Sequence, residues 1–264
     1  MKIGLIIIGD EILSGKRQDK HLSAFIELLA ERGMSLDWAQ YLGDDREHIT
    51  AQLRQAFASG DLVISCGGIG ATPDDHTRQA AAAALGQDLA LHPQARELIW
   101  QRICDMAAEK GETADPEDPN TLRRLEMGVF PQQAEIVPNP FNKIPGFSFG
   151  SVYFVPGFPV MAHPMMAWVL DHKHADLHRA RGVQEKSLIV KGAMEASLTP
   201  LMESVETEFP GIKVFSLPSV DHPQWGRHIE LGVKGDAARL DAAYDALKSG
   251  VIQFGASIST EMVR

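Results

Sequence analysis

The stretch 61–75 constrains the fold more than any other part of the chain. It opens with a short apolar run, Asp61-Leu-Val-Ile-Ser65, which is typical of a strand buried in a parallel sheet. Thr72 is predicted to be the N-cap of a following helix, with Asp75 as the acidic partner of a capping box. Between strand and helix, three of four positions carry no side chain that could keep a ligand away from the backbone: Gly67, Gly68 and Gly70.

A strand, a glycine loop and a helix N-terminus in succession predict an anion site. Such a junction directs unpaired N–H groups and the positive end of the helix dipole at one point, which suits a phosphate. Asp74 and Asp75 belong to the same junction, and two carboxylates beside a phosphate need a cation between them. We therefore hypothesise a phosphorylated ligand held by backbone amides, with a divalent metal bridging it to the acids. The alternative is that both acids only favour the helix dipole.

A second acidic turn stands near the start of the chain. The apolar run Ile3 to Ile8 is typical of a central strand, and it ends in Gly9-Asp10-Glu11. Ligands bind at the carboxyl edge of open α/β sheets, so the two acidic turns converge on one crevice if their strands adjoin. A metal held by Asp10, Glu11, Asp74 and Asp75 would have only oxygen ligands, which favour Mg²⁺ or Mn²⁺ over zinc. The first turn could equally serve to cap the next helix.

The order of elements predicts two domains. Strands alternate with amphipathic helices in the first part, which indicates an α/β fold with a mostly parallel sheet and helices on both faces. The later order, β-α-β-β-α with a last strand at Val251–Phe254 or beyond, indicates a smaller α+β domain of the split βαβ type. We expect domains at 1–175 and 186–264 with a connector at 171–185. The connector carries three histidines and is predicted to be solvated: His172, His174 and His178.

Composition limits the classes of partner. The 264 residues include 35 acidic and 25 basic side chains, a formal net charge of −10, which argues against nucleic acid or an anionic membrane as partner. Two cysteines, Cys66 and Cys104, are too few for a disulfide framework. The apolar start of the chain is too short for a signal peptide or a membrane span, so we expect a cytoplasmic protein.

Several motifs occur in the order and spacing of a known family. They are Gly9-Asp10-Glu11, Gly43-Asp44-Asp45, the glycine loop with Asp74-Asp75-x-Thr77-Arg78, Asn139-Pro140 with Pro145-Gly146-Phe147, and Pro156-Gly157-x-Pro159. Over roughly residues 1–170 the sequence resembles the N-terminal region of the competence/damage-inducible protein A (CinA) family. The resemblance implies a molybdopterin-binding, MoaB/Mog-like fold. It does not reach the C-terminal nicotinamide-nucleotide amidase domain of many members, so we do not expect that deamidation.

The chain departs from the family pattern at several positions. His21 stands where an asparagine is common, and Asn142-Lys143-Ile144 stands where Gly-Thr-Ala is usual. The family's Thr-Gly-Gly-Leu-Gly-Pro-Thr reads Ser65-Cys66-Gly67-Gly68-Ile69-Gly70-Ala71-Thr72 here. These departures concern the identity of the ligand rather than the fold.

The resemblance implies two functions. One is binding of a phosphorylated pterin such as molybdopterin, or of a nucleotide; the other is hydrolysis of the pyrophosphate of ADP-ribose or a related dinucleotide with Mg²⁺, Mn²⁺ or Co²⁺. We place binding first, and we expect the larger domain to carry the site and to self-associate as a homo-oligomer.

Each candidate residue has a predicted role. Asp74 and Asp75 would be catalytic in the hydrolytic alternative. We predict that the phosphorylated ligand is bound by Gly67, Gly68, Gly70, Thr72, Arg78, Asn139 and Gly146. Arg78 could add a bidentate contact to phosphate or face solvent. Cys66 has no histidine motif to activate it and is interpreted as a packed strand-end residue.

Overall fold

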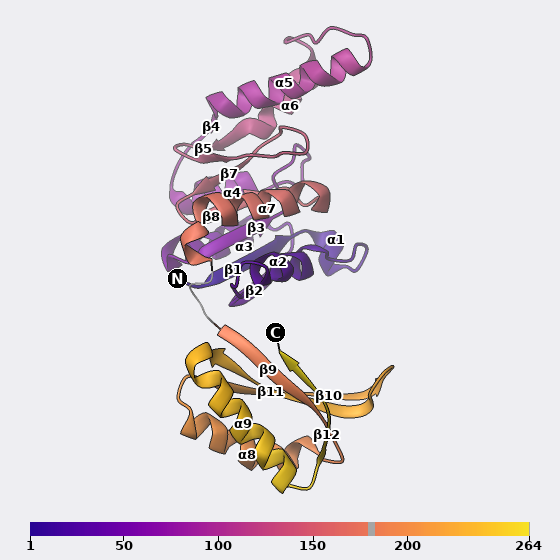
Figure 1. The fold of residues 1–264 in the computed structure, drawn as a ribbon. Coiled ribbons are helices and arrows are strands. Elements are labelled where there is room, and N and C mark those ends of the chain that lie inside the picture. Colours follow the sequence, from indigo (N-terminus) through magenta and orange to yellow (C-terminus); the bar gives the residue numbers. More distant parts are fainter. Residues whose placement is uncertain (179–182, 264) are drawn as a thin grey trace. The chain divides into compact units, whose positions relative to one another are not determined.

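The computed structural model describes residues 1–178 and 183–263. The chain forms two compact units, Met1–Asp176 and Leu177–Arg264 (Figure 1). That each unit folds as an independent domain stays a prediction. Among the described residues, no helix is both long and apolar enough to cross a bilayer.

The first unit is built on a six-stranded sheet in the order β2-β1-β3-β8-β7-β6. β1 pairs in parallel with β2 and β3, and β3 pairs in parallel with β8, whereas β7 runs antiparallel to both β8 and β6. The predicted mostly parallel sheet is therefore confirmed. The strands are β1 (Ile3–Ile8), β2 (Trp38–Leu42), β3 (Leu62–Cys66), β6 (Glu135–Val137), β7 (Gly146–Phe149) and β8 (Val152–Val155).

The strand order places helices on both faces of this sheet. From β1 the chain moves outward to β2 and then returns past β1 to β3, and right-handed crossovers in opposite directions lie on opposite faces. The central strands β1 and β3 are accordingly buried at every residue, which explains their continuous apolar runs. The principal helices are α2 (His21–Ala30), α3 (Arg46–Ser59), α4 (Thr77–Leu85) and α7 (Pro159–Lys173), with α2 packed on α7 and α3 on α4.

A helical segment not covered by the alternating pattern follows α4. The short strands β4 (Leu89–Leu91) and β5 (Val129–Pro131) form an antiparallel pair that the sequence patterns missed, because three residues are too few to show a period. Between them lie α5 (Pro93–Glu109), α6 (Pro119–Leu125) and the turn η1 (Glu126–Gly128) (Figure 1). Both helices have a proline in the first turn, a position where the missing N–H costs no helix hydrogen bond.

The second unit is a four-stranded antiparallel sheet in the order β10-β11-β9-β12 with two helices. This βαββαβ arrangement confirms the predicted split βαβ fold. The predicted last strand is present but starts later than Val251, at Ser257, because α9 continues to Gln253 and buries Val251. The elements are β9 (Val183–Lys191), α8 (Glu195–Glu208), β10 (Lys213–His222), β11 (Gly226–Asp236), α9 (Ala237–Gln253) and β12 (Ser257–Val263).

The expected solvated connector is helical at its start. α7 extends to Lys173, and η2 (Ala175–Leu177) follows it. His174 is buried, with its Nε2 2.9 Å from the Tyr153 hydroxyl, so this histidine is a core residue and the prediction was wrong for it. The last part of the connector, 179–182, lies outside the described residues.

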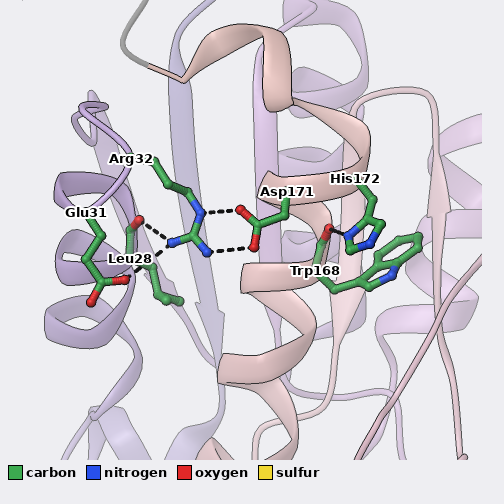
Figure 2. A network of polar contacts seen from close by, with 6 residues as sticks. All are labelled: Leu28, Glu31, Arg32, Trp168, Asp171 and His172. Carbon is green, nitrogen blue, oxygen red and sulfur yellow. Dashed lines mark hydrogen bonds and ion pairs between the residues drawn. The ribbon is translucent and has the colours of Figure 1, made fainter.

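A polar network ties α2 to α7 (Figure 2). The Arg32 guanidinium donates Nε to Asp171 Oδ1 at 2.6 Å and a second nitrogen to Asp171 Oδ2 at 2.8 Å, the bidentate geometry that suits arginine and carboxylate. Arg32 also donates to the carbonyl of Leu28. On the same end of α7, the ring of His172 stacks on Trp168 with 5.0 Å between centroids. These contacts fix the C-terminal end of α7, whose N-terminal end reaches the candidate site.

Candidate functional site

A cavity of about 510 Å³ lies at the carboxyl edge of the parallel strands. This edge is the topological switch point between β1 and β3, where open α/β sheets bind ligands. Segments that follow β1, β2, β3 and β8 all line it, and so do the proline loop before β7 and η1. The volume lies within the range of small-molecule sites. The two acidic turns predicted to converge therefore do open onto one crevice, through Glu11 of the first and Asp74 and Asp75 of the second.

The glycine loop has its shape because side chains cannot be accommodated there. Gly67 has φ +101°, and a Cβ on it would lie 2.3 Å from the carbonyl oxygen of Ile8. Gly68 has φ +69°, and its Cβ would lie 2.2 Å from Thr77 Oγ1. Thr77 holds the loop by donating its hydroxyl to Gly67 O and its amide to Gly68 O, both at 3.0 Å. The glycines are thus required by close packing between two strand ends and α4.

The loop presents a run of unpaired amides to the cavity. The amide of Gly67 donates to Val155 O at 3.0 Å and continues the sheet. For the next residues, Gly68 to Ala71, no acceptor within the described part of the chain takes the backbone N–H, although all of them line the cavity. Consecutive free N–H groups of this kind form an anion-binding concavity. This observation supports the role predicted for Gly68 and Gly70.

The helix after the loop begins later than predicted. α4 starts at Thr77, and residues 72–75 form a separate turn in which Asp75 Oδ2 accepts from Thr72 N at 2.9 Å and Thr72 Oγ1 at 2.5 Å. The predicted capping box is therefore wrong as a helix cap, because the acid bonds back to Thr72 within an isolated turn. Hydrogen bonding from Thr72 and from its own amide lowers the pKa of Asp74, which is exposed at the cavity.

The acidic turns after β1 and β2 are bonded to each other. The amide of Asp10 donates to Asp44 Oδ2 at 2.8 Å, and the amide of Asp44 donates to Asp10 Oδ1 at 3.2 Å. Burial raises the pKa of Asp44, and the neighbouring charges of Asp10, Asp74 and Glu11 raise it further. Asp44 lines the cavity and Asp10 does not. The resemblance included Asp44 in a motif, but the acids chosen as metal ligands did not include it, because sequence spacing does not show which carboxylate of a turn faces inward.

The carboxylates do not form a finished metal centre. Among the described residues, no three His, Cys, Asp or Glu side chains are grouped closely enough to hold an ion. Asp10 and Asp75 are already engaged in turn hydrogen bonds, as described above. Mg²⁺ characteristically takes one or two protein carboxylates and completes its shell with phosphate oxygens and water. The donors here, Asp74, Asp44 and Glu11, fit a cation shared with a phosphorylated ligand and do not fit an all-protein cage.

Two predicted ligand contacts lie off the cavity, and a third is engaged in hydrogen bonds within the proline loop. Arg78 does not line the cavity; its buried guanidinium donates to the carbonyls of Gly70 and Glu126, so it neither faces solvent nor reaches the ligand site. Gly146 also lies off the cavity, in β7, where a Cβ would be 2.1 Å from Phe154 O. Asn139 does line the cavity, but its amide donates to Asn142 Oδ1 and Ile144 O and so shapes the proline loop.

The cavity wall includes residues that were not among the predicted site. His21, Arg17, Phe158 and Met161 all line it. His21 is buried, its Nε2 lies 3.1 Å from Gly157 O, and its Nδ1 has no hydrogen-bond partner in the described structure. The departure from asparagine was the available signal for His21; no sequence signal marked the other three.

Cys66 is not a candidate nucleophile. It is buried at the end of β3, and burial raises the pKa of its thiol well above the ordinary value, with the charge of Asp19 as a smaller cause. A thiolate is therefore disfavoured at this position, in keeping with its interpretation as a packed strand-end residue.

An open α/β sheet with a glycine-lined cavity at its switch point defines a class of small-ligand-binding domains. Comparison with known families shows which family this domain belongs to. The chain belongs to the family described as "Probable molybdopterin binding domain", which matches residues 4–175.

Similar proteins agree with the resemblance of the sequence to the CinA family. A CinA-like protein of Syntrophotalea carbinolica is 30% identical over 229 residues, covering 81% of this chain and 53% of its own length. A CinA-like protein of Anaeromyxobacter dehalogenans is 29% identical over 210 residues, covering 77% of this chain and 49% of the relative. The chain thus spans about half the length of these curated relatives, and the similarity to the N-terminal part of CinA-like proteins is confirmed.

A solved structure supports the fold of the first unit. The crystal structure of the protein CinA, with unknown function, from Thermoplasma acidophilum matches with a TM-score of 0.54 and 26% identity. The match covers 65% of this chain and 98% of that chain.

Proposed function

We propose that this chain binds a phosphorylated pterin or nucleotide in the cavity at the glycine loop. The observation that carries the proposal is the run of free backbone amides from Gly68 to Ala71 at the wall of a ligand-sized cavity. Buried or partly enclosed N–H groups are rarely left without acceptors unless something else supplies them. Phosphate oxygens are suitable acceptors, and membership of the molybdopterin-binding family favours a ligand of this class.

The acids explain why a divalent cation belongs in this proposal. Glu11, Asp44 and Asp74 share the cavity wall, and their mutual repulsion contributes to the raised pKa of Asp44. A phosphate brought among them without a cation would add to that repulsion. Mg²⁺ or Mn²⁺ bound with the ligand would offset it, held by one or two of these carboxylates. Self-association of the chain is proposed as well, on the family resemblance alone.

Hydrolysis of a pyrophosphate is the second candidate function. It is favoured by Asp74, which is exposed at the cavity and whose lowered pKa keeps it ionised, so that it can orient water beside the glycine loop. A bound divalent cation would supply charge neutralisation on the phosphoryl oxygens. Binding remains first, because Asp75 is tied to Thr72 and is not free to act as a second catalytic carboxylate.

Amide chemical shifts provide a direct test of binding at the glycine loop. The ¹⁵N-labelled protein should be titrated with AMP, ADP-ribose and a phosphorylated pterin, with and without Mg²⁺. We expect saturable shifts of the Gly68–Ala71 amides, and smaller shifts of the Gly67 amide, which is already bonded to Val155 O. Amides of β11 in the second unit serve as the internal control. Saturable shifts elsewhere with an unchanged glycine loop would contradict the proposal.

Turnover separates the two candidate functions. ADP-ribose should be incubated with the protein and Mg²⁺, Mn²⁺ or Co²⁺, and release of AMP measured for the wild type and for Asp74→Asn. Release that falls at least about 100-fold in the variant, at an unchanged melting temperature, would establish the hydrolytic candidate. Binding without release of AMP in any metal would establish the first.

A further inference from the structure

The chemical character of the cavity wall changes along the strand order. The charged side chains that line it are Glu11, Arg17, Asp44, Asp74 and Asp75. They come from the loops after β1, β2 and β3, the first three strands of the order. From residue 127 onward the lining is uncharged: it comprises η1, the proline loop and the segment after β8. In the strand order β2-β1-β3-β8, the charged loops after β1 and β2 and the uncharged segment after β8 belong to strands on either side of β3. The glycine loop after β3 lies between them, and Gly157 packs against Gly67.

Arg17 is the cationic side chain of the charged part of the wall. It is the one Lys or Arg among the described residues that line the cavity, whereas four carboxylates line it. Its backbone amide donates to Glu11 O at 2.9 Å, which anchors the loop, while no hydrogen bond or ion pair to another described residue holds its guanidinium. An exposed, unpaired guanidinium that lines the same cavity as free backbone amides is suited to bidentate contact with a phosphate.

The uncharged part of the wall offers an aromatic face. Phe158 is 55% exposed although it lines the cavity, and its backbone is fixed as the N-cap of α7, where its carbonyl accepts from Met161 N and Ala162 N. Met161 lines the same part, and its sulfur accepts from Asn142 Nδ2 at 3.2 Å. An exposed phenyl ring at a fixed position contributes most to binding when the ligand presents a flat ring, because stacking on that ring buries the phenyl face.

The proposed function supplies the chemistry of that ring, because pterins and nucleobases are flat and heteroaromatic. His21 belongs to the same wall, where its Nε2 lies 3.1 Å from the carbonyl oxygen of Gly157.

We propose that the cavity takes its ligand in one orientation, with the phosphate against Arg17 and the glycine loop and an uncharged heteroaromatic ring against Phe158 and Met161. This inference rests on the proposed function and makes it more specific. It assigns the two ends of the ligand to two residues, Arg17 and Phe158, that neither the resemblance nor the sequence patterns single out. Sugar phosphates that lack an aromatic ring are then partial ligands. So are heteroaromatic compounds that lack a phosphate.

The test compares complete and partial ligands on matched variants. The probes are AMP, adenosine and ribose 5-phosphate, together with a phosphorylated pterin and its dephosphorylated form, each with Mg²⁺. The proteins are the full wild-type chain, Arg17→Ala and Phe158→Ala. Arg46→Ala and Val160→Ala are the controls, because both residues are exposed and neither lines the cavity. Dissociation constants are measured by calorimetry, and melting temperatures verify that each variant is folded.

We expect Arg17→Ala to weaken AMP and ribose 5-phosphate at least about 10-fold and to leave adenosine within about 2-fold. Phe158→Ala should weaken AMP and adenosine at least about 5-fold and leave ribose 5-phosphate unchanged. The phosphorylated pterin should bind more weakly to both variants, and its dephosphorylated form should bind more weakly to Phe158→Ala alone. The dissociation constants of both control variants should be close to those of the wild type.

Two results would overturn the inference and can be told apart. If the wild type binds but Arg17→Ala weakens adenosine as much as AMP, or Phe158→Ala changes no ring-bearing ligand, the orientation is wrong and the proposed function stands. If the folded wild type binds none of the probes, the proposed function fails together with the orientation.

Discussion

At the scale of single residues, the cavity shows how one residue type takes different roles according to its neighbours. Arg78 is buried and holds the carbonyls of Gly70 and Glu126, so it connects the glycine loop to the turn that carries Met127 into the cavity wall. Arg17 lines the same cavity with its guanidinium unpaired among the described residues. The sequence predicted a ligand contact or a solvent-facing position for Arg78, because helix periodicity does not show which distant loop returns over a helix.

Asp44 provides a prediction about pH. The folded state raises its pKa, mainly by burial and then by the charges of Asp10, Asp74 and Glu11, so the fold favours the protonated carboxyl. Its contribution to stability is therefore fully present below the ordinary pKa of 3.8 and is lost as the pH rises through the raised pKa. Asp44→Asn keeps the acceptor for the Asp10 amide and removes the charge. Without divalent cations, the variant should melt about 1–2 °C above the wild type at pH 7.5.

The difference in melting temperature should shrink steadily when the same scans are repeated between pH 6 and pH 4. Asp45→Asn is the matched control, since it removes a charge one position further on and keeps an N-cap acceptor for the His48 amide. It should show no comparable gain. A gain for Asp44→Asn that stays constant with pH would mean that its ionisation is not the cause.

At the scale of elements, the glycine loop depends on the close approach of two strand ends. The ends of β1 and β3 are neighbours in the sheet, and Gly67 packs directly on the carbonyl of Ile8. Position 67 is therefore constrained twice, once by its positive φ and once by the contact. Gly15, in the loop after β1, also has a positive φ of 73° but has no atom within 4 Å of an added Cβ.

This pair of glycines separates the two constraints. Gly15→Ala should cost about 1 kcal/mol, the ordinary penalty for a side chain at positive φ. Gly67→Ala should cost at least about 3 kcal/mol, because the Ile8 carbonyl belongs to a sheet strand and cannot move away cheaply. Urea unfolding of both variants, followed by circular dichroism, measures the difference. Equal losses would show that the contact between the strand ends is relaxed at little cost.

The proline loop is bonded to helices on two sides. Asn142 of the loop donates its Nδ2 to the sulfur of Met161 in the N-terminal half of α7. Lys143, which has φ 66°, forms an ion pair with Asp105 of α5 at 2.6 Å and does not line the cavity. The departure Asn142-Lys143-Ile144 thus has a structural consequence. It ties the proline loop to two helices and leaves Asn142 and Ile144 at the cavity wall.

At the scale of the whole molecule, the two units have separate cores. The first is centred on β1, β3 and β8, with Phe147 and Phe154 stacked at 4.3 Å between centroids. The second is formed by the inner face of its own sheet with α8 and α9, around residues such as Leu188, Leu231 and Leu247. The site described above lies entirely in the first unit.

Separate cores predict that the units fold independently. A fragment of residues 1–178 should keep the ligand affinity of the full chain, and residues 183–264 should fold on their own in spite of their small size. Overlay of ¹⁵N spectra of each fragment on that of the full chain measures both expectations. Collapsed or shifted spectra for either fragment would show that the units depend on each other for stability.

The sequence by itself determined the elements whose signals are local. Continuous apolar runs indicated β1 and β3, three closely spaced glycines indicated the loop after β3, and the change in element order indicated the split βαβ fold of the second unit. It also indicated that acidic turns and a glycine loop share one sheet edge, because parallel strands bring their carboxyl ends together.

Only the tertiary structure decided which side chains face the cavity. Asp44 rather than Asp10 lines it, Arg17 rather than Arg78 is free for a ligand, and Phe158 provides an aromatic face. Which side chains line the cavity depends on contacts between segments far apart in the chain, such as the hydrogen bond from the Arg78 guanidinium to the carbonyl of Glu126. Periodicity and spacing report on neighbours along the chain, whereas a cavity is defined by neighbours in space.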